Sequence, residues 1–220
     1  MTRPHSHTRF HIPACLLSML TFGAATLGLT TQVKGGTPLI CQANDIGMAP
    51  SLPWRVGPHW NQPRSDYAPE RLLPDTLAVL TATAPVIVRM ETMRRATIYA
   101  RSFAEKGHPR LAVEILSRLQ ARALEAEALG APDALAWFDA GYFAGSIESW
   151  EATRARGEYA GYAWVRKAIG LRGGDPAMEL AAAMMSLESP KKPDGHWARA
   201  SAGRKTDPLL AHNLASRLSR

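Results

Sequence analysis

Apolar residues recur at steps of three and four along most of this chain, and that spacing constrains the fold more than any other feature. It places the apolar side chains on one face of an α-helix. The first run consists of Val86, Met90, Met93, Thr97, Ala100 and Phe103. A second run follows a turn at Gly107 and Pro109 and consists of Ala112, Leu116, Leu119, Ala123 and Ala126. Two helices joined by so short a turn should be antiparallel neighbours.

Further helices are indicated by periodicity and by their start signals. We expect helices over residues 133–154 and 158–171. The pairs Asp175-Pro176 and Asp207-Pro208 each open another, because Asp is a good N-cap and Pro suits the first turn. No β-branched run alternates with period two after residue 75, so we expect no sheet. The predicted fold class is all-α, and residues 75–189 are its helical domain.

The solvent side of the first helix also carries a predicted contact. Glu91 and Arg95 stand four residues apart, a spacing at which opposite charges pair on a helix surface. We expect this ion pair to face water.

Residues 32–74 differ in composition from the helical domain. They contain seven prolines, which are incompatible with helix interiors and central strands: Pro38, Pro50, Pro53, Pro58, Pro63, Pro69 and Pro74. Trp54, Trp60 and Tyr67 are interleaved with them. The segment is predicted to be an extended arm. Either it wraps the helical body and buries its aromatic side chains, or it presents an extended segment to a partner, as polyproline peptides do.

Residues 1–31 have the pattern of a secretory signal. Arg3 and Arg9 precede an uncharged, mainly apolar stretch over residues 12–29. We expect export to the periplasm or the medium; the alternatives are a single N-terminal membrane anchor and a cytosolic protein with a misleading start. Cleavage would leave Cys41 as the single cysteine, so the fold would form without an internal disulfide.

The net charge of +7 is concentrated at the C-terminus. Residues 32–189 carry 17 basic and 17 acidic side chains, whereas residues 190–220 carry seven basic and two acidic ones, a net +5. We expect a mobile basic linker over 190–206 and a helix over 207–219. The helix either docks on the domain or joins the linker in binding an anionic envelope surface. Export argues against nucleic acid as a partner.

Residues 161–185 resemble the junction between two tetratricopeptide-type helical hairpins. Small or medium residues that match the helix crossings are Gly161, Val165, Ala168, Ala181 and Ala182, and the large residues are Met178 and Met185. The two Asp-Pro pairs lie 32 residues apart, close to the period of such repeats. The resemblance implies an irregular stack of hairpins and a binding role. An unrelated small helical bundle is the alternative.

No catalytic, metal or nucleotide motif occurs in the sequence, and we expect no cofactor and no metal site. The one chemical pattern that could support catalysis is a set of carboxylates near aromatic residues: Asp139, Glu148 and Glu151. Two of them converging on a cleft could act as an acid/base pair. An envelope hydrolase of this kind is the alternative function.

Half of the aromatic residues fall within residues 137–164. Small neighbours such as Gly141 and Gly145 allow close helix packing there, so the cluster forms either a helix–helix seam or a partly exposed groove for a sugar or peptide. The candidate ligand-binding residues are Trp137, Tyr142, Trp150, Tyr159, Tyr162 and Trp164. The leading hypothesis is a non-enzymatic exported helical protein that binds a protein partner or an envelope component.

Overall fold

The computed structural model describes residues 39–55, 61–150, 160–186 and 195–218, without the side chains of Trp150 and Leu218. The chain divides into two units, Met1–Lys34 and Gly35–Arg220. The predicted signal, Trp60 and Tyr159 lie outside the described residues, and the helices and contacts described below belong to the second unit.

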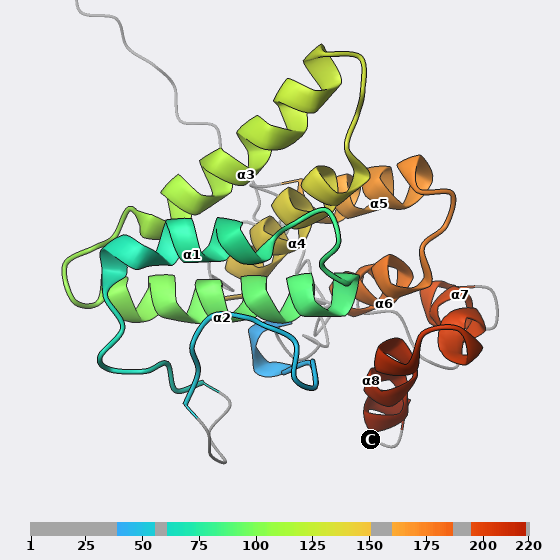
Figure 1. Cartoon of the computed structure of the whole chain (residues 1–220), viewed down its shortest axis with the longest axis horizontal. Coiled ribbons are helices and arrows are strands. Elements are labelled where there is room, and N and C mark those ends of the chain that lie inside the picture. Colours follow the sequence, from blue (N-terminus) through green and yellow to red (C-terminus); the bar gives the residue numbers. More distant parts are fainter. Residues whose placement is uncertain (1–38, 56–60, 151–159, 187–194, 219–220) are drawn as a thin grey trace, which may run out of the picture. The chain divides into compact units, whose positions relative to one another are not determined.

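The prediction of an all-α fold is confirmed. Eight α-helices occur in the described residues, with one isolated antiparallel bridge between Trp54 and Pro63. They pack around one apolar core (Figure 1). The helices are α1 (Leu72–Val79), α2 (Val86–Ala104), α3 (Leu111–Ala128), α4 (Ala134–Trp150), α5 (Gly161–Leu171), α6 (Pro176–Met185), α7 (His196–Ala202) and α8 (Pro208–Leu218).

Helix α2 contacts α1, α3, α4 and α6. All six residues of its predicted apolar stripe are buried. The opposite side is buried as well, which corrects the expectation of a solvent-facing Glu91–Arg95 pair. The pair forms, with Arg95 Nε 2.8 Å from Glu91 Oε1, but the side chain of Glu91 is only 2% exposed. The arm covers it.

The extended arm is ordered against the body over its described part, which agrees with the wrapping alternative. Leu52 and Tyr67 are buried and Trp54 is half-buried. Tyr67 packs on Tyr99 of α2 with ring centroids 4.6 Å apart, and the Trp54 ring meets Tyr99 edge-on at 5.6 Å. The arm therefore contributes aromatic surface to the core.

Two α-helices extend into segments that the sequence predicted to be non-helical. Helix α1 begins at Leu72 and contains Pro74, which we expected to exclude helix. Proline is tolerated there because the first-turn N–H groups have no partner within the helix. Helix α7 occupies part of the stretch predicted as a mobile linker; Trp197 and Ala200 are buried and fasten it to the core.

The C-terminal helix docks on the domain, the first of the two alternatives for it. Asp207 caps α8 by accepting a hydrogen bond from the Leu210 amide at 2.9 Å. Leu210 and Leu214 are fully buried on its inner face.

Helices α4 and α5 cross at very close range through three glycines. A Cβ placed on Gly161 would lie 2.7 Å from the Gly145 amide nitrogen and 2.8 Å from the Gly141 carbonyl oxygen. Both neighbours are backbone atoms, which cannot move aside as a side chain can. Glycine is therefore required at this crossing for packing.

Gly161→Ala is expected to destabilise the protein by about 1–3 kcal/mol, because the added methyl group forces the two helix backbones apart. Urea unfolding followed by circular dichroism measures the change. Gly170→Ala on the same helix is the matched control, since an added Cβ there meets no atom within 4 Å. Equal stability of the two variants would contradict the close crossing.

Candidate functional site

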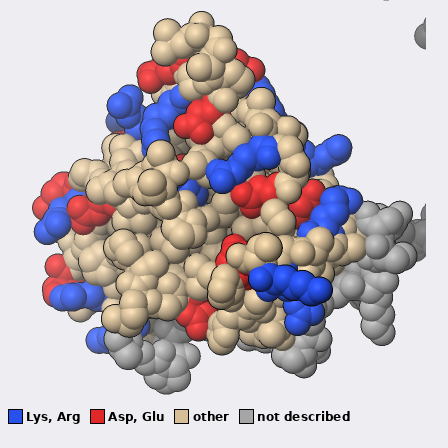
Figure 2. Space-filling model, turned by 45° about the vertical axis from the view of Figure 1, so that its right-hand side comes forward, with Lys and Arg blue, Asp and Glu red and all other residues tan. Residues whose placement is uncertain are grey.

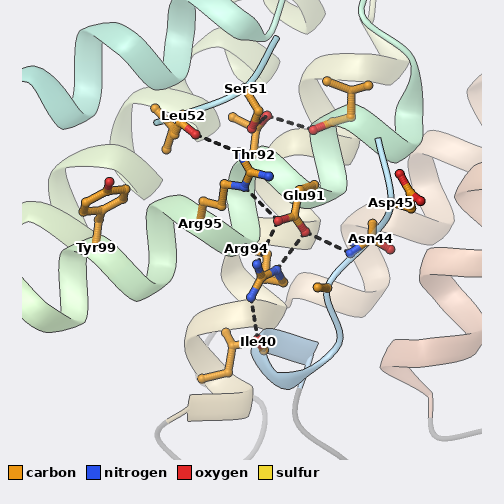
Figure 3. A network of polar contacts seen from close by, with 12 residues as sticks. Ile40, Asn44, Asp45, Ser51, Leu52, Glu91, Thr92, Arg94, Arg95 and Tyr99 are labelled. Atoms are coloured by element: carbon orange, nitrogen blue, oxygen red, sulfur yellow. Dashed lines mark hydrogen bonds and ion pairs between the residues drawn. The ribbon is translucent and has the colours of Figure 1, made fainter. Parts of the chain in front are cut away.

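Side chains of α2 hold the arm by its main chain (Figure 3). The Glu91 carboxylate accepts a hydrogen bond from the backbone N–H of Asn44 at 2.9 Å. Arg94 donates to the Ile40 carbonyl at 3.1 Å, and Arg95 donates to the Leu52 carbonyl at 2.8 Å. The network thus joins arm residues far apart in the sequence to one turn of α2.

Glu91 is the hub of this network. Arg94 binds both of its oxygens at 2.8 Å, and Arg95 adds a third bond at 2.8 Å. Burial alone would raise the pKa of the Glu91 carboxyl, but the hydrogen bonds and charges of the two arginines outweigh burial and hold the pKa below its usual value. A buried carboxylate with two guanidinium partners is fully ionised at neutral pH.

Helix α8 holds the arm by the same chemistry. The Asp45 amide donates to Asn213 Oδ1 at 2.9 Å, and Asn213 Nδ2 donates back to the Asp45 carbonyl at 2.7 Å. One side-chain amide thereby satisfies both main-chain groups of one arm residue. Arg217 adds bonds to the side chains of Gln42 and Asn44.

An open groove lies between α1 and the start of α3, with a volume of about 630 Å³. Its lining residues are Leu73, Pro109, Arg110, Val113, Glu114, Ser117 and Arg118. Val113 is 57% exposed, although it is a large apolar side chain in the middle of this wall. Two arginines and one glutamate line the groove, so its charged side chains carry a net charge of +1.

The predicted aromatic residues occupy different environments. Trp137 and Tyr142 are buried in the core, where Trp137 packs against Trp164 of α5 with ring centroids 6.0 Å apart. Burial raises the pKa of Tyr142 to about 12. Tyr162 and Trp164 are half-buried. Trp137 and Trp164 therefore lie in a seam between α4 and α5, whereas Tyr142 stacks on Phe138 of its own helix within the core.

A polar cluster that the sequence did not reveal joins three helices. The Tyr162 hydroxyl of α5 lies 2.8 Å from His196 Nε2 of α7, and His196 Nδ1 contacts the Glu179 carboxylate of α6. Arg199 also binds Glu179, at 2.8 Å. The cluster fastens α7 to the two helices before it. Residues on three separate helices leave no local pattern by which this contact could have been found.

The carboxylates considered for catalysis do not line the groove. Asp139 is buried and its Oδ2 lies 2.6 Å from Arg89 Nη1, while Glu148 is half-buried on α4. Glu151 lies outside the described residues. Burial raises the pKa of Asp139 to about 7, against the attraction of Arg89.

The raised pKa of Asp139 predicts a pH dependence of stability. The folded protein holds the proton more tightly than the unfolded chain, so the contribution is fully present below pH 4 and is lost as the pH rises through 7. Urea unfolding at pH 5 and pH 7.5 should show a loss for the wild type that Asp139→Asn does not show. An identical pH response of both proteins would contradict the prediction.

Comparisons with known proteins do not indicate a function for this chain. No protein-family model, curated protein or solved structure matches the chain. Within the residues that the structure describes, no helix is long and apolar enough to span a bilayer, and no three His, Cys, Asp or Glu side chains are grouped as metal ligands.

Proposed function

We propose that this chain is an exported, non-enzymatic helical protein that binds a protein partner, and that the α1–α3 groove receives a segment of that partner. The observation that carries the proposal is the exposed apolar wall at Val113 in a groove with a net positive charge. Large apolar side chains gathered at a concave surface are typical of binding sites. The resemblance of α5 and α6 to tetratricopeptide-type hairpins, which are binding scaffolds, supports the same role.

The chemistry of the groove suggests the partner segment. Leu73, Pro109 and Val113 offer apolar contact, and Arg110 and Arg118 offer charge-assisted hydrogen bonds. A segment with an apolar side chain flanked by a carboxylate would satisfy both. On the face shown in Figure 2, acidic and basic side chains are interspersed, so that face carries no broad patch of one charge.

An anionic envelope surface is the alternative partner within this proposal. Arg204 and Lys205 are exposed beside α7, and Lys191 and Lys192 lie outside the described residues. Arg199 is bound to Glu179, and Arg217 is bound to the arm. Of the four basic residues of the C-terminal segment that the structure describes, Arg199 and Arg217 are thus engaged within the fold.

Capture from a detergent-solubilised envelope fraction, with the chain lacking residues 1–31 as bait, tests the proposal. Val113→Glu should abolish capture of a discrete protein, because it places a charge on the apolar wall. Leu171→Glu on α5 is the matched control, since Leu171 is another exposed apolar residue, 41% accessible, outside the groove. Capture that ignores Val113→Glu and disappears in high salt would instead favour the basic C-terminal segment and an anionic surface.

Export itself carries a separate prediction. A reporter fused after residue 31 should appear outside the cytoplasm, and Leu17→Arg should retain it inside, because an arginine interrupts the apolar stretch of the signal. Cell fractionation and reporter activity measure the distribution. A wild-type fusion that stays soluble in the cytoplasm would contradict the assignment of residues 1–31.

A further inference from the structure

Helix α3 carries a second stripe of apolar and small residues, on the side opposite the stripe that packs into the core. Its members follow one another at steps of three and four along the helix: Val113, Ser117, Ala121, Leu124 and Ala128. Ala121 is half-buried and the other four are exposed, with Val113 at 57% and Leu124 at 48%. Apolar residues gathered on one helix face indicate a surface that packs against another element. The described part of the chain leaves this face open.

The two ends of α3 differ. Its first turns form one wall of the α1–α3 groove, with Val113 and Arg118 in the lining. Its last turn stands clear of α1 and α2 (Figure 1) and exposes Leu124, and Leu129 just beyond it is 84% exposed. Sixteen residues separate Val113 from Leu129, which is about 24 Å of helix. The exposed end of α3 therefore cannot fill the groove of its own chain, whereas the same end of a second copy can.

We propose that the partner segment in the groove is residues 124–129 of a second copy, so that two α3 helices pair antiparallel about a two-fold axis. The inference rests on the proposed function, because it names the occupant of the same groove. A two-fold interface brings the same surface together from both copies, so each groove receives the other copy's helix end. One helix from each copy makes a small interface, and we expect association that strengthens with concentration.

The side chains of the stripe match in size in this arrangement. When the axis passes near Ala121, Val113 lies opposite Ala128 of the second copy and Leu124 lies opposite Ser117. Ala121 lies opposite itself at the centre. Each large residue thus faces a small one, and the small pair at the centre lets the two helices approach closely.

The charges of α3 favour the same register. Arg118 and Glu125 are both exposed, and within the described residues neither side chain forms a hydrogen bond or an ion pair. They stand two helical turns apart and so lie on the same flank of the stripe. Antiparallel pairing about Ala121 sets Arg118 of each copy beside Glu125 of the other. Two reciprocal ion pairs of this kind fix the register, and the pair Leu124-Glu125 supplies the apolar side chain and the carboxylate that suit the groove.

A single cysteine at the centre of the stripe tests the two-fold axis. The full chain carries Ala121→Cys with Cys15→Ser and Cys41→Ser, so that position 121 holds its only cysteine. A short bis-maleimide added to intact cells should join two chains, because position 121 of one copy meets that of the other. Glu114→Cys on the same helix is the matched control, since the two copies of residue 114 would lie about 21 Å apart along the pair. Denaturing gels should show several-fold more covalent dimer from position 121, and equal yields would overturn the proposal.

Exchanging the charges tests the register. In the Ala121→Cys chain, Arg118→Glu sets two carboxylates beside each other at both ion pairs, and Glu125→Arg sets two guanidinium groups there. Each substitution should lower the yield of covalent dimer several-fold. The double variant Arg118→Glu/Glu125→Arg should restore it, because both pairs form again with the charges exchanged. Single variants without effect, or a double variant without recovery, would overturn the proposal.

The mass of an adduct separates this inference from the proposed function on which it rests. A photoreactive amino acid at position 113 of the full chain should give an adduct of twice the mass of the chain. An adduct of another mass would overturn the second copy as the occupant and leave the groove as a binding site for a different protein. No adduct at all would overturn both.

Discussion

Glu91→Ala should lower the free energy of unfolding by about 3–5 kcal/mol, the usual cost of removing one partner from a buried ion pair. The substitution leaves Arg94 buried without its carboxylate and deprives the Asn44 amide of its acceptor. An uncompensated buried charge costs more than the lost contacts themselves. Urea unfolding followed by tryptophan fluorescence measures the change.

Glu125→Ala on α3 is the matched control for this variant. Glu125 is exposed, so its removal should change stability by less than about 0.5 kcal/mol. If Glu91→Ala unfolds within about 1 kcal/mol of the wild type, the arm is not fastened through this carboxylate.

Met93→Asp should be the most disruptive substitution, with a loss of more than about 4 kcal/mol or failure to fold. Met93 is fully buried on the inner face of α2, where a carboxylate would find no solvent and would have to displace packed side chains. Far-ultraviolet circular dichroism and limited proteolysis report the loss of structure.

Met48→Asp provides the same chemical change at a fully exposed position of the arm. Its melting curve should match that of the wild type. If Met93→Asp melts at the same temperature as Met48→Asp, the inner face of α2 was assigned wrongly.

The helices could be predicted from the sequence because periodicity and caps are local signals. The stripe from Val86 to Phe103 and the Asp175-Pro176 and Asp207-Pro208 starts all fall on observed helices. The first turn of α1 was missed because the proline rule was applied to the whole arm, whereas Pro74 stands in a first turn. Helix α7 was missed because its stability comes from burying Trp197 rather than from a periodic pattern.

The environment of the charged residues could not be predicted in the same way. The i,i+4 spacing identified the Glu91–Arg95 pair, but its burial depends on Asn44 and Leu52, each more than 40 residues away. The contact of Tyr162 with His196 likewise spans 34 residues. Periodicity does not tell a polar face that meets water from one that meets another part of the chain.

The same limit applies to the candidate site. Trp137 and Tyr142 were predicted as ligand-binding residues because they belong to an aromatic cluster in the sequence. Both side chains are buried where helices pack together. The groove residues Arg110, Val113 and Arg118 lie at the start of a helix that the sequence predicted. Of the five residues in its predicted inward stripe, Leu116, Leu119 and Ala123 are buried, whereas Ala112 and Ala126 are half-buried. Val113 lies off that stripe, so an exposed position was expected for it. Only the structure shows that Leu73 of α1 lines the same groove.

Photocrosslinking in intact cells tests the central proposal, an exported protein whose α1–α3 groove binds a partner. The full chain is produced with a photoreactive amino acid at position 113, or at position 171 as the control. We predict one discrete adduct from position 113, recovered with the envelope fraction and lost when Arg118→Glu reverses the charge at position 118. No adduct from position 113, or the same adducts from both positions, would contradict the proposal.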